Sequence, residues 1–249
     1  MGADVATNSE RSGAKGSSRR RPTAGYARGE ETRLRIIRAA VELFGNEGFD
    51  RVSTRDIAAR AGVNAPVLQY YFNGKEGLYV ACVEYMQLHT TKLLQPVIDT
   101  VRKRLAGKLT REGLIDCVCY IYEQAAEFLL THSEINAWKR FAAWDVVDRD
   151  NVPCSAHKAL DRGIRREFRQ LLCELVGRII GRSAQDEQTR IRVVTLGSQL
   201  SVFHDARQKA LDDLGWTEVN ERELTLLKEV VREQTAAALR AAAANAKKS

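Results

Sequence analysis

The sequence predicts an all-α protein of about nine helices, with a small amino-terminal three-helix domain followed by a larger helical domain. Apolar residues recur at helical spacing along most of the 249 residues. Only four prolines occur, and alternating runs of Val, Ile and Thr are scarce. Residues 53–78 contain two very short helical patterns separated by a glycine, an arrangement that fixes how the first domain is built.

Residues 1–29 are rich in Gly, Ser, Ala and Arg and have no apolar period, so we expect a disordered basic arm. The cluster Arg19 to Arg21 is either a solubilising tail or an arm that reaches phosphates or the minor groove of DNA. Residues 1–75 hold 13 Lys and Arg against 8 Asp and Glu, which is +5 of the net charge of +7. A basic amino-terminal segment fits a polyanionic partner.

The first long helix is predicted from about residue 32 to residue 46. Gly45 and Gly48 should terminate it, and Phe49 and Val52 should fill the small core before the next helix. Its apolar residues form one buried stripe: Ile36, Ala40, Leu43 and Phe44.

The stretch STRDIAARAGVNAPVLQYYFNGKEGL follows. Ser53 can cap a short helix, and Asp56 three residues later completes a capping-box pattern. Gly62 stands where that helix would end in the left-handed conformation, and Asn64 can cap a second short helix. Two short helices joined by a tight turn containing Gly form the helix-turn-helix motif, whose second helix enters the major groove of DNA.

A resemblance becomes specific over about 50 residues. The matching features are the IIxAAxxLF helix, the turn at Gly48 and Phe49, the STRDIAxxAGV helix and the YYFNGKEGL exit. This run resembles the amino-terminal domain of the TetR family of transcriptional regulators. The chain is similar to the subgroup with an AGVN…YYF-G-KEGLY head and a GSQLSVFHDARQKALDDLGW-type body.

This resemblance implies an all-helical homodimer. Its DNA-binding head would cover residues 30–76, its ligand-binding and dimerisation body would cover residues 77–243, and residues 244–249 would be a disordered tail.

The resemblance also assigns the DNA contacts. Gln69 could read an adenine in bidentate fashion, and Lys75 matches a lysine that binds a backbone phosphate. Many relatives carry Tyr at the position of Gln69 and Thr or Ser at that of Val67. Leu68 and Phe72, four residues apart, should be core. The predicted contact residues are Thr54, Arg55, Ala65, Pro66, Val67, Gln69, Tyr70, Tyr71 and Lys75.

Helical periodicity continues through the second domain. The first helix there should run from Lys75 to about Pro96, which should end or kink it. In the family this helix links head and body, so its tilt would transmit the ligand state. Further helices are expected over residues 110–130, 133–147, 155–182, 187–214 and 219–243.

Four aromatic residues are candidates for the wall of an effector pocket. Three of them recur at i, i+3 and i+6, so they project from one side of a helix and form either core or a pocket wall. Arg140 beside them would anchor an anionic ligand or form a surface ion pair. The aromatic content favours a small hydrophobic effector. The candidates are Tyr122, Trp138, Phe141 and Trp144.

In the family, the last two helices pair with those of a second subunit. A monomer that buries the same side chains in its own core is the alternative interpretation. Candidates for the dimer interface are Val194, Leu196, Leu200, Val202, Phe203, Leu224, Leu227 and Val231.

Other functional classes lack their motifs in this sequence. Gly74-Lys75 is followed by Glu76, which excludes a P-loop, and no GxSxG occurs, so we predict no enzyme and no cofactor. The five cysteines and four histidines show no metal-ligand spacing. Cys117 and Cys119 are weak candidates for redox sensing, because residues two apart on a helix face different directions. We expect buried thiols in a soluble cytoplasmic protein without membrane contact.

The sequence therefore predicts a ligand-responsive transcriptional regulator. We expect a repressor that binds double-stranded DNA at a pseudo-palindromic operator as a dimer and is released by a small-molecule effector. The alternatives are a helical DNA-binding protein without strong sequence preference, or a helical enzyme.

Overall fold

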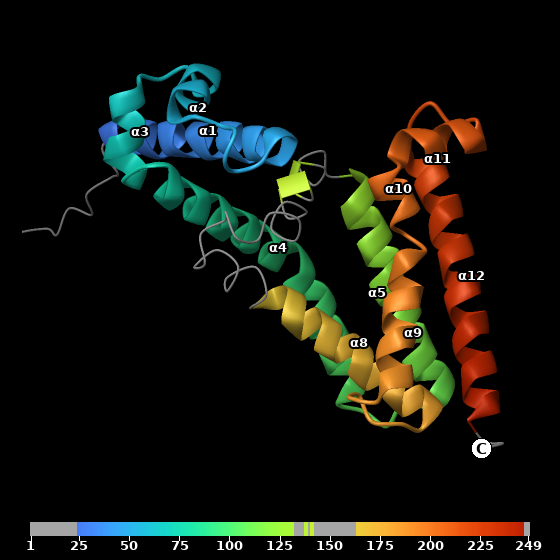
Figure 1. The fold of residues 1–249 in the computed structure, drawn as a ribbon. Helices are drawn as coiled ribbons and strands as arrows, with labels where there is room; N and C mark the ends of the chain where they lie inside the picture. Colours follow the sequence, from blue (N-terminus) through green and yellow to red (C-terminus); the bar gives the residue numbers. More distant parts are fainter. Residues whose placement is uncertain (1–23, 132–136, 139, 142–162, 247–249) are drawn as a thin grey trace, which may run out of the picture.

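The computed structural model describes residues 24–131, 137–138, 140–141 and 163–246, and every regular element in these ranges is an α-helix (Figure 1). The helices form a small amino-terminal head and a larger body, joined by one long helix. The predicted all-α class is confirmed. Within the same ranges, no helix is long and apolar enough to cross a membrane.

The head consists of α1 (Ala24–Glu47), α2 (Thr54–Ala61) and α3 (Ala65–Phe72), which pack around the start of α4 (Lys75–Leu105). Full burial of one such aliphatic or aromatic side chain contributes about 1.5–3 kcal/mol relative to leaving it exposed. The head core includes Ile36, Ile37, Ala40, Phe44, Ile57, Leu68, Phe72 and Leu78.

Helix α1 begins earlier than the sequence suggested. The expected disorder over residues 24–29 is wrong, because these residues form the first turns of α1. Gly29 lies against α3, where a Cβ atom would stand 3.2 Å from the hydroxyl of Tyr71. Packing of this kind stabilises a helix beyond its intrinsic propensity. Residues 1–23 of the expected arm lie outside the described residues.

Helix α4 continues through Pro96 to Leu105, so the expected end at the proline is wrong. Proline costs the helix one backbone hydrogen bond. Buried side chains on either side of it, including Leu94 and Ile98, pack into the body core and offset that loss. The carbonyl of Pro96 also accepts a hydrogen bond from the Thr100 hydroxyl at 2.7 Å.

The body is organised around α5 (Arg111–Thr131), α8 (Ile164–Ile180) and α12 (Glu221–Asn245). Helix α5 packs extensively on α12 and also on α8, and α8 contacts α4. Helix α12 reaches Asn245, so the disorder expected for residues 244 and 245 is wrong, and residues 247–249 lie outside the described residues. The alanine-rich end explains this, since alanine has the highest helix propensity.

Cations on α12 face carboxylates on α5. Arg232 contacts Asp116 at 2.7 Å and Glu123 at 2.8 Å, and Arg240 contacts Glu112 at 2.7 Å. Lys228 pairs with Glu127 in the same way. Exposed ion pairs are individually weak, so this row mainly fixes the alignment of the two helices, whose facing side chains form the core.

The single helix expected over residues 187–214 is broken into three. These are α9 (Glu187–Ser198), α10 (Val202–Asp205) and α11 (Arg207–Leu214). Hydroxyl side chains cause the first break by competing for backbone carbonyls. The hydroxyl of Ser198 donates to the Thr195 carbonyl at 2.7 Å, and Ser201 donates to the Ser198 carbonyl at 2.8 Å.

Residues 137–138 and 140–141, which follow α5 in the sequence, are helical and pack against the head. Phe141 is fully buried and Trp138 is 5% exposed, and both belong to the head core. A Cβ atom on Gly45 would lie 2.9 Å from the carbonyl oxygen of Ala137, so this glycine permits the close approach. The structure thus anchors a segment from beyond α5 on the carboxyl end of α1.

Candidate nucleic-acid interface

Helix α2 is fixed at both ends by the features that the sequence predicted. The hydroxyl of Ser53 accepts from the Asp56 amide at 3.2 Å, and the Asp56 carboxylate accepts from the Ser53 amide at 3.0 Å. These reciprocal bonds form the capping box. Gly62 ends the helix with a φ of 64°. The pKa of Asp56 is lowered, first by its hydrogen bond from the Ser53 side chain and then by that from the Ser53 backbone.

Helix α3 begins after Asn64, whose backbone is extended but whose side chain makes no capping hydrogen bond. The expected side-chain cap is therefore wrong, although the helix starts where predicted. Pro66 stands in the first turn, where no intrahelical N–H is needed. The Val67 amide donates to the Asn64 carbonyl at 3.0 Å, which closes the first turn of α3.

Exposure along α3 separates core from surface residues. Leu68 is 1% exposed and Phe72 is 6% exposed, as predicted for the core pair. Tyr70 is 84% exposed, and Pro66 and Gln69 are also exposed. The helix therefore presents Pro66, Gln69 and Tyr70 to the outside of the head.

Contacts within α3 hold this face in place. The amide of the Gln69 side chain donates to Asn73 Oδ1 at 3.4 Å. The rings of Tyr70 and Tyr71 meet edge to face, with centroids 5.3 Å apart. Asn73 closes the helix with a φ of 56°, a conformation that Asn tolerates better than most residues.

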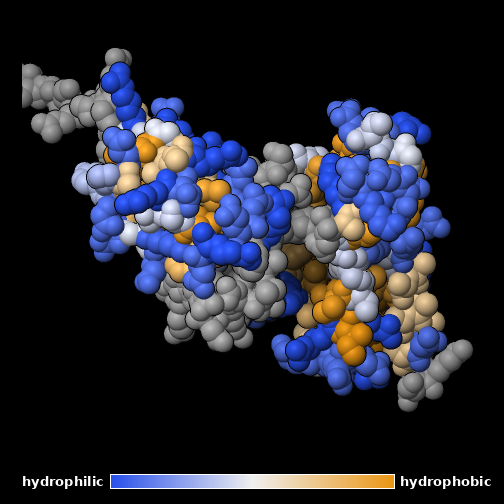
Figure 2. Space-filling view, turned by 45° about the horizontal axis from the view of Figure 1, so that its top comes forward, coloured by the Kyte–Doolittle hydropathy of each residue, from blue (hydrophilic) through white to orange (hydrophobic). Residues whose placement is uncertain are grey.

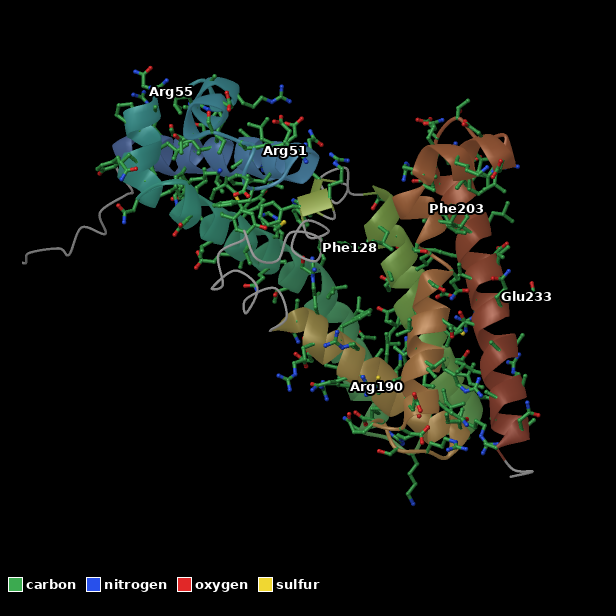
Figure 3. All side chains as sticks on the ribbon, in the orientation of Figure 1. Arg51, Arg55, Phe128, Arg190, Phe203 and Glu233 are labelled. Atoms are coloured by element: carbon green, nitrogen blue, oxygen red, sulfur yellow. The ribbon has the colours of Figure 1, made fainter. Side chains whose placement is uncertain are left out.

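The remaining predicted contact residues lie around α3. Thr54 and Arg55 stand in the first turn of α2, and Arg55 is exposed on the side of the head away from the body (Figure 3). Ala65, Val67 and Tyr71 are half-buried along α3. The structure thus brings all of the predicted head residues to one region formed by α2, α3 and the start of α4.

Lys75 occupies the first position of α4 and is partly tucked against the head. Its ammonium nitrogen lies 4.4 Å from the centre of the Phe49 ring and donates to the Asp50 carbonyl at 3.3 Å. Partial burial lowers its pKa, and the charge of Asp50 opposes that shift. The lysine is therefore oriented by the chain itself, with less freedom than an extended surface lysine.

Other arginines of the head differ in how far they are neutralised. Arg60 pairs with Glu42 at 2.6 Å, and Arg33 pairs with Glu30 at 3.7 Å. Across the part of the chain that the structure describes, Arg55 makes no ion pair. This leaves Arg55 as a free positive charge beside α3.

Arg28 is an additional candidate that the sequence reasoning placed in a disordered arm. It is exposed on the first turns of α1, next to Gly29, which approaches Tyr71 of α3. No local motif marks Arg28. Only the packing of α1 on α3 brings it near the exposed face.

The predicted pocket residues do not come together. Tyr122 lies in the body core, where its hydroxyl donates to the Val193 carbonyl at 3.2 Å and burial raises its pKa. Trp138 and Phe141 lie in the separate head core. A shared wall formed by these three residues is therefore wrong, and the alternative of plain core holds for them. Trp144 lies outside the described residues.

The predicted dimer residues divide between surface and core. Leu200, Leu227 and Val231 are buried in the body, so the monomer-core alternative holds for them. Val194 is 69% exposed. Phe203 and Leu224 are half-buried, packed against the body core.

Exposed apolar side chains on α9 and α12 include the predicted Val194, together with Leu226 and Val230, which each lie one position before a predicted residue. A second helical face of α9 and α12 carries them, and the sequence periodicity alone does not say which face packs inward. They are Ile191, Val194, Leu226 and Val230. Figure 2 shows hydrophobic residues gathered on the part of the body near the end of the chain.

Comparison with known proteins agrees with this architecture. Residues 36–82 match the family described as bacterial regulatory proteins, tetR family, and residues 121–242 match the C-terminal domain of the HTH-type transcriptional dual regulator CecR. The chain is 23% identical over 206 residues to CecR of Shigella flexneri, covering 82% of this chain and 89% of that protein.

Two further similarities concern part of the sequence and the fold. The chain is 32% identical over 91 residues to the HTH-type transcriptional repressor Rv3405c of Mycobacterium tuberculosis, covering 35% of this chain and 48% of that one. A TetR-family regulator from Bordetella parapertussis has the same fold, with a TM-score of 0.54 at 16% identity over 83% of this chain and 94% of that one.

Fold and motif together define a helix-turn-helix DNA-binding transcription regulator. The chain belongs to the TetR family, with a CecR-like carboxyl-terminal domain. It is a transcription regulator.

Proposed function

We propose that the protein is a repressor that binds a pseudo-palindromic operator as a homodimer and leaves it when a small-molecule effector binds the body. The observation that carries this proposal is the exposed face of α3. Pro66, Gln69 and Tyr70 project outward while Leu68 and Phe72 hold the helix on the head. A short helix held in this way can enter a major groove.

Each part of the face has a chemical task in this proposal. Ala65, Pro66 and Val67 at the tip offer apolar contact to a thymine methyl group, and Gln69 offers bidentate hydrogen bonds to adenine. Arg55 and Lys75 contact phosphates on either side and set the register without reading sequence. Thr54, Tyr70 and Tyr71 supply hydroxyl groups for further phosphate contacts.

The dimer is proposed on the outward face of α9 and α12. Ile191, Val194, Leu226 and Val230 are exposed there, and alanines continue the face along α12. Clusters of exposed apolar side chains mark interaction surfaces more often than isolated ones do. A two-fold dimer would place two α3 helices in successive major grooves, about 34–36 Å apart. A regulator of this kind acts in the cytoplasm, where the chromosome is.

A gel-shift assay on the DNA that flanks the protein's own gene tests the proposal. We expect a retarded complex that survives a large excess of unrelated competitor DNA and protects a two-fold symmetric site. Binding that competitor DNA abolishes in proportion to its mass would instead identify a sequence-independent DNA-binding protein.

A further inference from the structure

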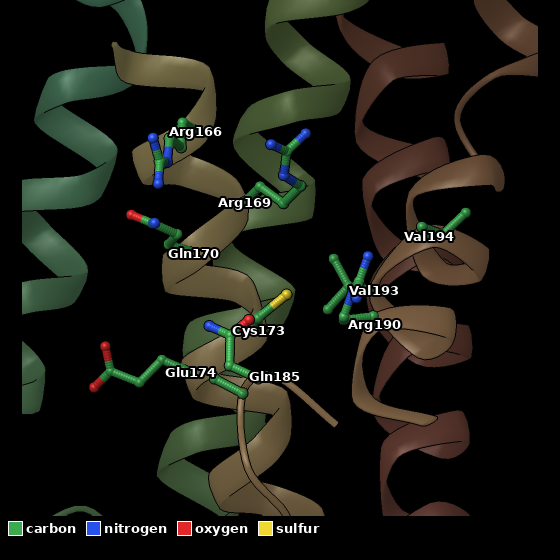
Figure 4. A pocket seen from close by; sticks show the side chains of 10 residues that line it. Arg166, Arg169, Gln170, Cys173, Glu174, Gln185, Arg190, Val193 and Val194 are labelled. Carbon is green, nitrogen blue, oxygen red and sulfur yellow. The ribbon is translucent and has the colours of Figure 1, made fainter. Parts of the chain in front are cut away.

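A groove of about 780 Å³ lies between α8 and α9, away from the head (Figure 4). Its lining combines side chains from α8, from the loop that follows it and from α9. Cys173 points from α8 toward α9, where Arg190 and Val193 stand opposite. Of the residues predicted from the sequence to bind an effector, the three that the structure describes (Tyr122, Trp138 and Phe141) do not line this groove.

The groove carries an excess of positive charge. Arg166 and Arg169 come from α8 and Arg190 comes from α9, whereas Glu174 is the one carboxylate among the residues that line it. Glu174 already faces Arg178 at 3.9 Å. Burial raises the pKa of Cys173, and the positive charges of Arg169 and Arg190 partly offset that rise.

Two of these arginines lack a counter-charge. Over the ranges that the structure describes, the guanidinium groups of Arg166 and Arg190 form neither an ion pair nor a hydrogen bond. By contrast, Arg102 and Arg182 on neighbouring elements each have a carboxylate partner, at 3.2 and 3.4 Å. Arginines that line a groove without a partner are suited to bind a carboxylate or a phosphate.

The rest of the lining is mixed, because Gln170 and Gln185 are polar whereas Ala184, Val193 and Val194 are apolar. Val193 is 8% exposed and forms part of its floor, and Val194 is exposed on its edge. A second hollow of about 360 Å³ continues along α9 past Ile191 and shares Arg190 and Val194 with the first. Positive charge beside these apolar side chains suits a molecule with an anionic group and an apolar part.

We propose that the α8–α9 groove is the effector site and that it takes an amphipathic organic anion, with its carboxylate or phosphate near Arg190 and its apolar part along Val193, on the side of α9 that the proposed dimer face leaves open. The effector role rests on the proposed function, whereas anion binding in the groove does not. This site is different from the aromatic effector pocket that the sequence predicted.

The position of the groove gives the ligand a connection to the head. Arg166 is adjacent in sequence to Glu167, which pairs with Arg102 of α4 at 3.2 Å. An anion held from α8 and α9 together favours one arrangement of those helices, and α8 packs on α4. The ligand can shift the head only as far as its affinity differs between the two arrangements.

The test uses octanoate, octyl phosphate and octanol as probes in calorimetric titrations of the full chain. We expect both anions to bind and octanol to bind at least about tenfold more weakly, because it lacks the charge. Octanoate and octyl phosphate then show which anionic group the groove prefers.

Variants locate the site. The double variant Arg166→Gln/Arg190→Gln should weaken octanoate binding by about tenfold or more. Lys209→Gln is the matched control, because it removes a positive charge from α11, where Lys209 pairs with Asp213 at 3.3 Å. Unchanged octanoate binding in the double variant, or no binding of either anion to the wild type at millimolar concentration, would overturn the proposal.

A second measurement does not depend on the folding of any variant. Octanoate should slow the alkylation of Cys173 by iodoacetamide in the wild-type protein, read by mass spectrometry of the peptide that contains it. Equal alkylation rates with and without saturating octanoate would contradict a ligand in this groove. Neither measurement contains DNA. Failure of both would therefore overturn the ligand groove while leaving the gel-shift evidence for a regulator intact. Conversely, a failed gel shift would overturn the regulator proposal while leaving octanoate binding in the groove intact.

Discussion

The ring of Phe141 stacks on the ring of Tyr79 with centroids 4.4 Å apart, which joins a segment from beyond α5 to the helix that leaves the head. Phe44 of α1 meets the same Phe141 ring edge to face at 6.1 Å. The head core is therefore completed by a residue far along the chain. A DNA-binding head built in this way is not independent of the body.

Phe141→Ala should destabilise the head. Removing a fully buried Phe costs about 3–5 kcal/mol, from lost burial and from the cavity left behind. Phe141→Leu keeps most of the volume and should cost clearly less. Chemical denaturation followed by circular dichroism measures both values. Equal stability of the Ala variant and the wild type would show that the stacked pair contributes nothing.

Gly77→Ala should disrupt the junction between α3 and α4. A Cβ atom at this position would lie 1.9 Å from the Phe72 carbonyl oxygen, so one helix has to move. We expect a loss of about 3 kcal/mol, at the upper end for overpacking, together with weaker DNA binding. Thermal unfolding and a gel shift read the two effects.

Gly113→Ala in α5 is the matched control for this change. Its added Cβ would stand 3.3 Å from the flexible end of the Leu109 side chain. An alanine inside a helix is about 1 kcal/mol more favourable than a glycine, so this variant should be as stable as the wild type or slightly more stable. Similar losses in both glycine variants would refute the steric explanation for Gly77.

The helix-turn-helix and the Phe141 contact show what the sequence could and could not predict about the head. The capping box at Ser53 and the turn at Gly62 are local, so their residue types alone predicted the helix-turn-helix correctly. Phe141 was recognised as apolar and periodic, but the surface on which it packs is decided by tertiary contacts. Periodicity identifies a buried face and cannot say which partner covers it.

The same limit explains the errors in the body. Leu227 and Val231 lie on the inner face of α12, while Leu226 and Val230 lie on its outer face, and both pairs are apolar. When a helix is apolar on two sides, its sequence does not show which side packs against the core. The arginines of the α8–α9 groove are missed for a related reason, because they come from two helices that only the fold brings together.

The capping box makes part of the stability of α2 depend on pH. The folded-state pKa of Asp56 is lowered from 3.8, first by the side chain of Ser53 and then by its backbone. The free energy that the ionised Asp56 carboxylate adds to folding is therefore fully present above the pKa of Asp56 in the unfolded chain. It is lost as the pH falls through the lower pKa of Asp56 in the folded protein. Asp56→Asn should be less stable than the wild type at neutral pH, and the two stabilities should converge in acid. Thermal unfolding of both proteins over a series of pH values checks this, and a constant difference down to the most acidic pH would contradict it.

The buried cysteines should be inert. Burial raises the pKa of Cys119 to about 11 and also raises those of Cys82 and Cys117, so little thiolate forms near neutral pH. In native protein at pH 8, DTNB should react with Cys173, which is half-buried, well before these three. A Cys154→Ser background removes the remaining cysteine. Rapid reaction of Cys119 in the folded protein would revive the redox-sensing hypothesis.

The outward face of α3 carries the proposed DNA recognition, and fluorescence anisotropy on the identified operator tests its role directly. Titrations of Gln69→Ala and Arg55→Ala against operators substituted at each base pair distinguish residues that recognise a base from residues that contact the phosphate backbone. Gln69→Ala should lose about 1–3 kcal/mol of discrimination at one base pair, and Arg55→Ala should weaken all sites alike and lower the salt slope by about 1. An unchanged base preference of Gln69→Ala at every operator position would contradict the proposed role of α3 in reading DNA.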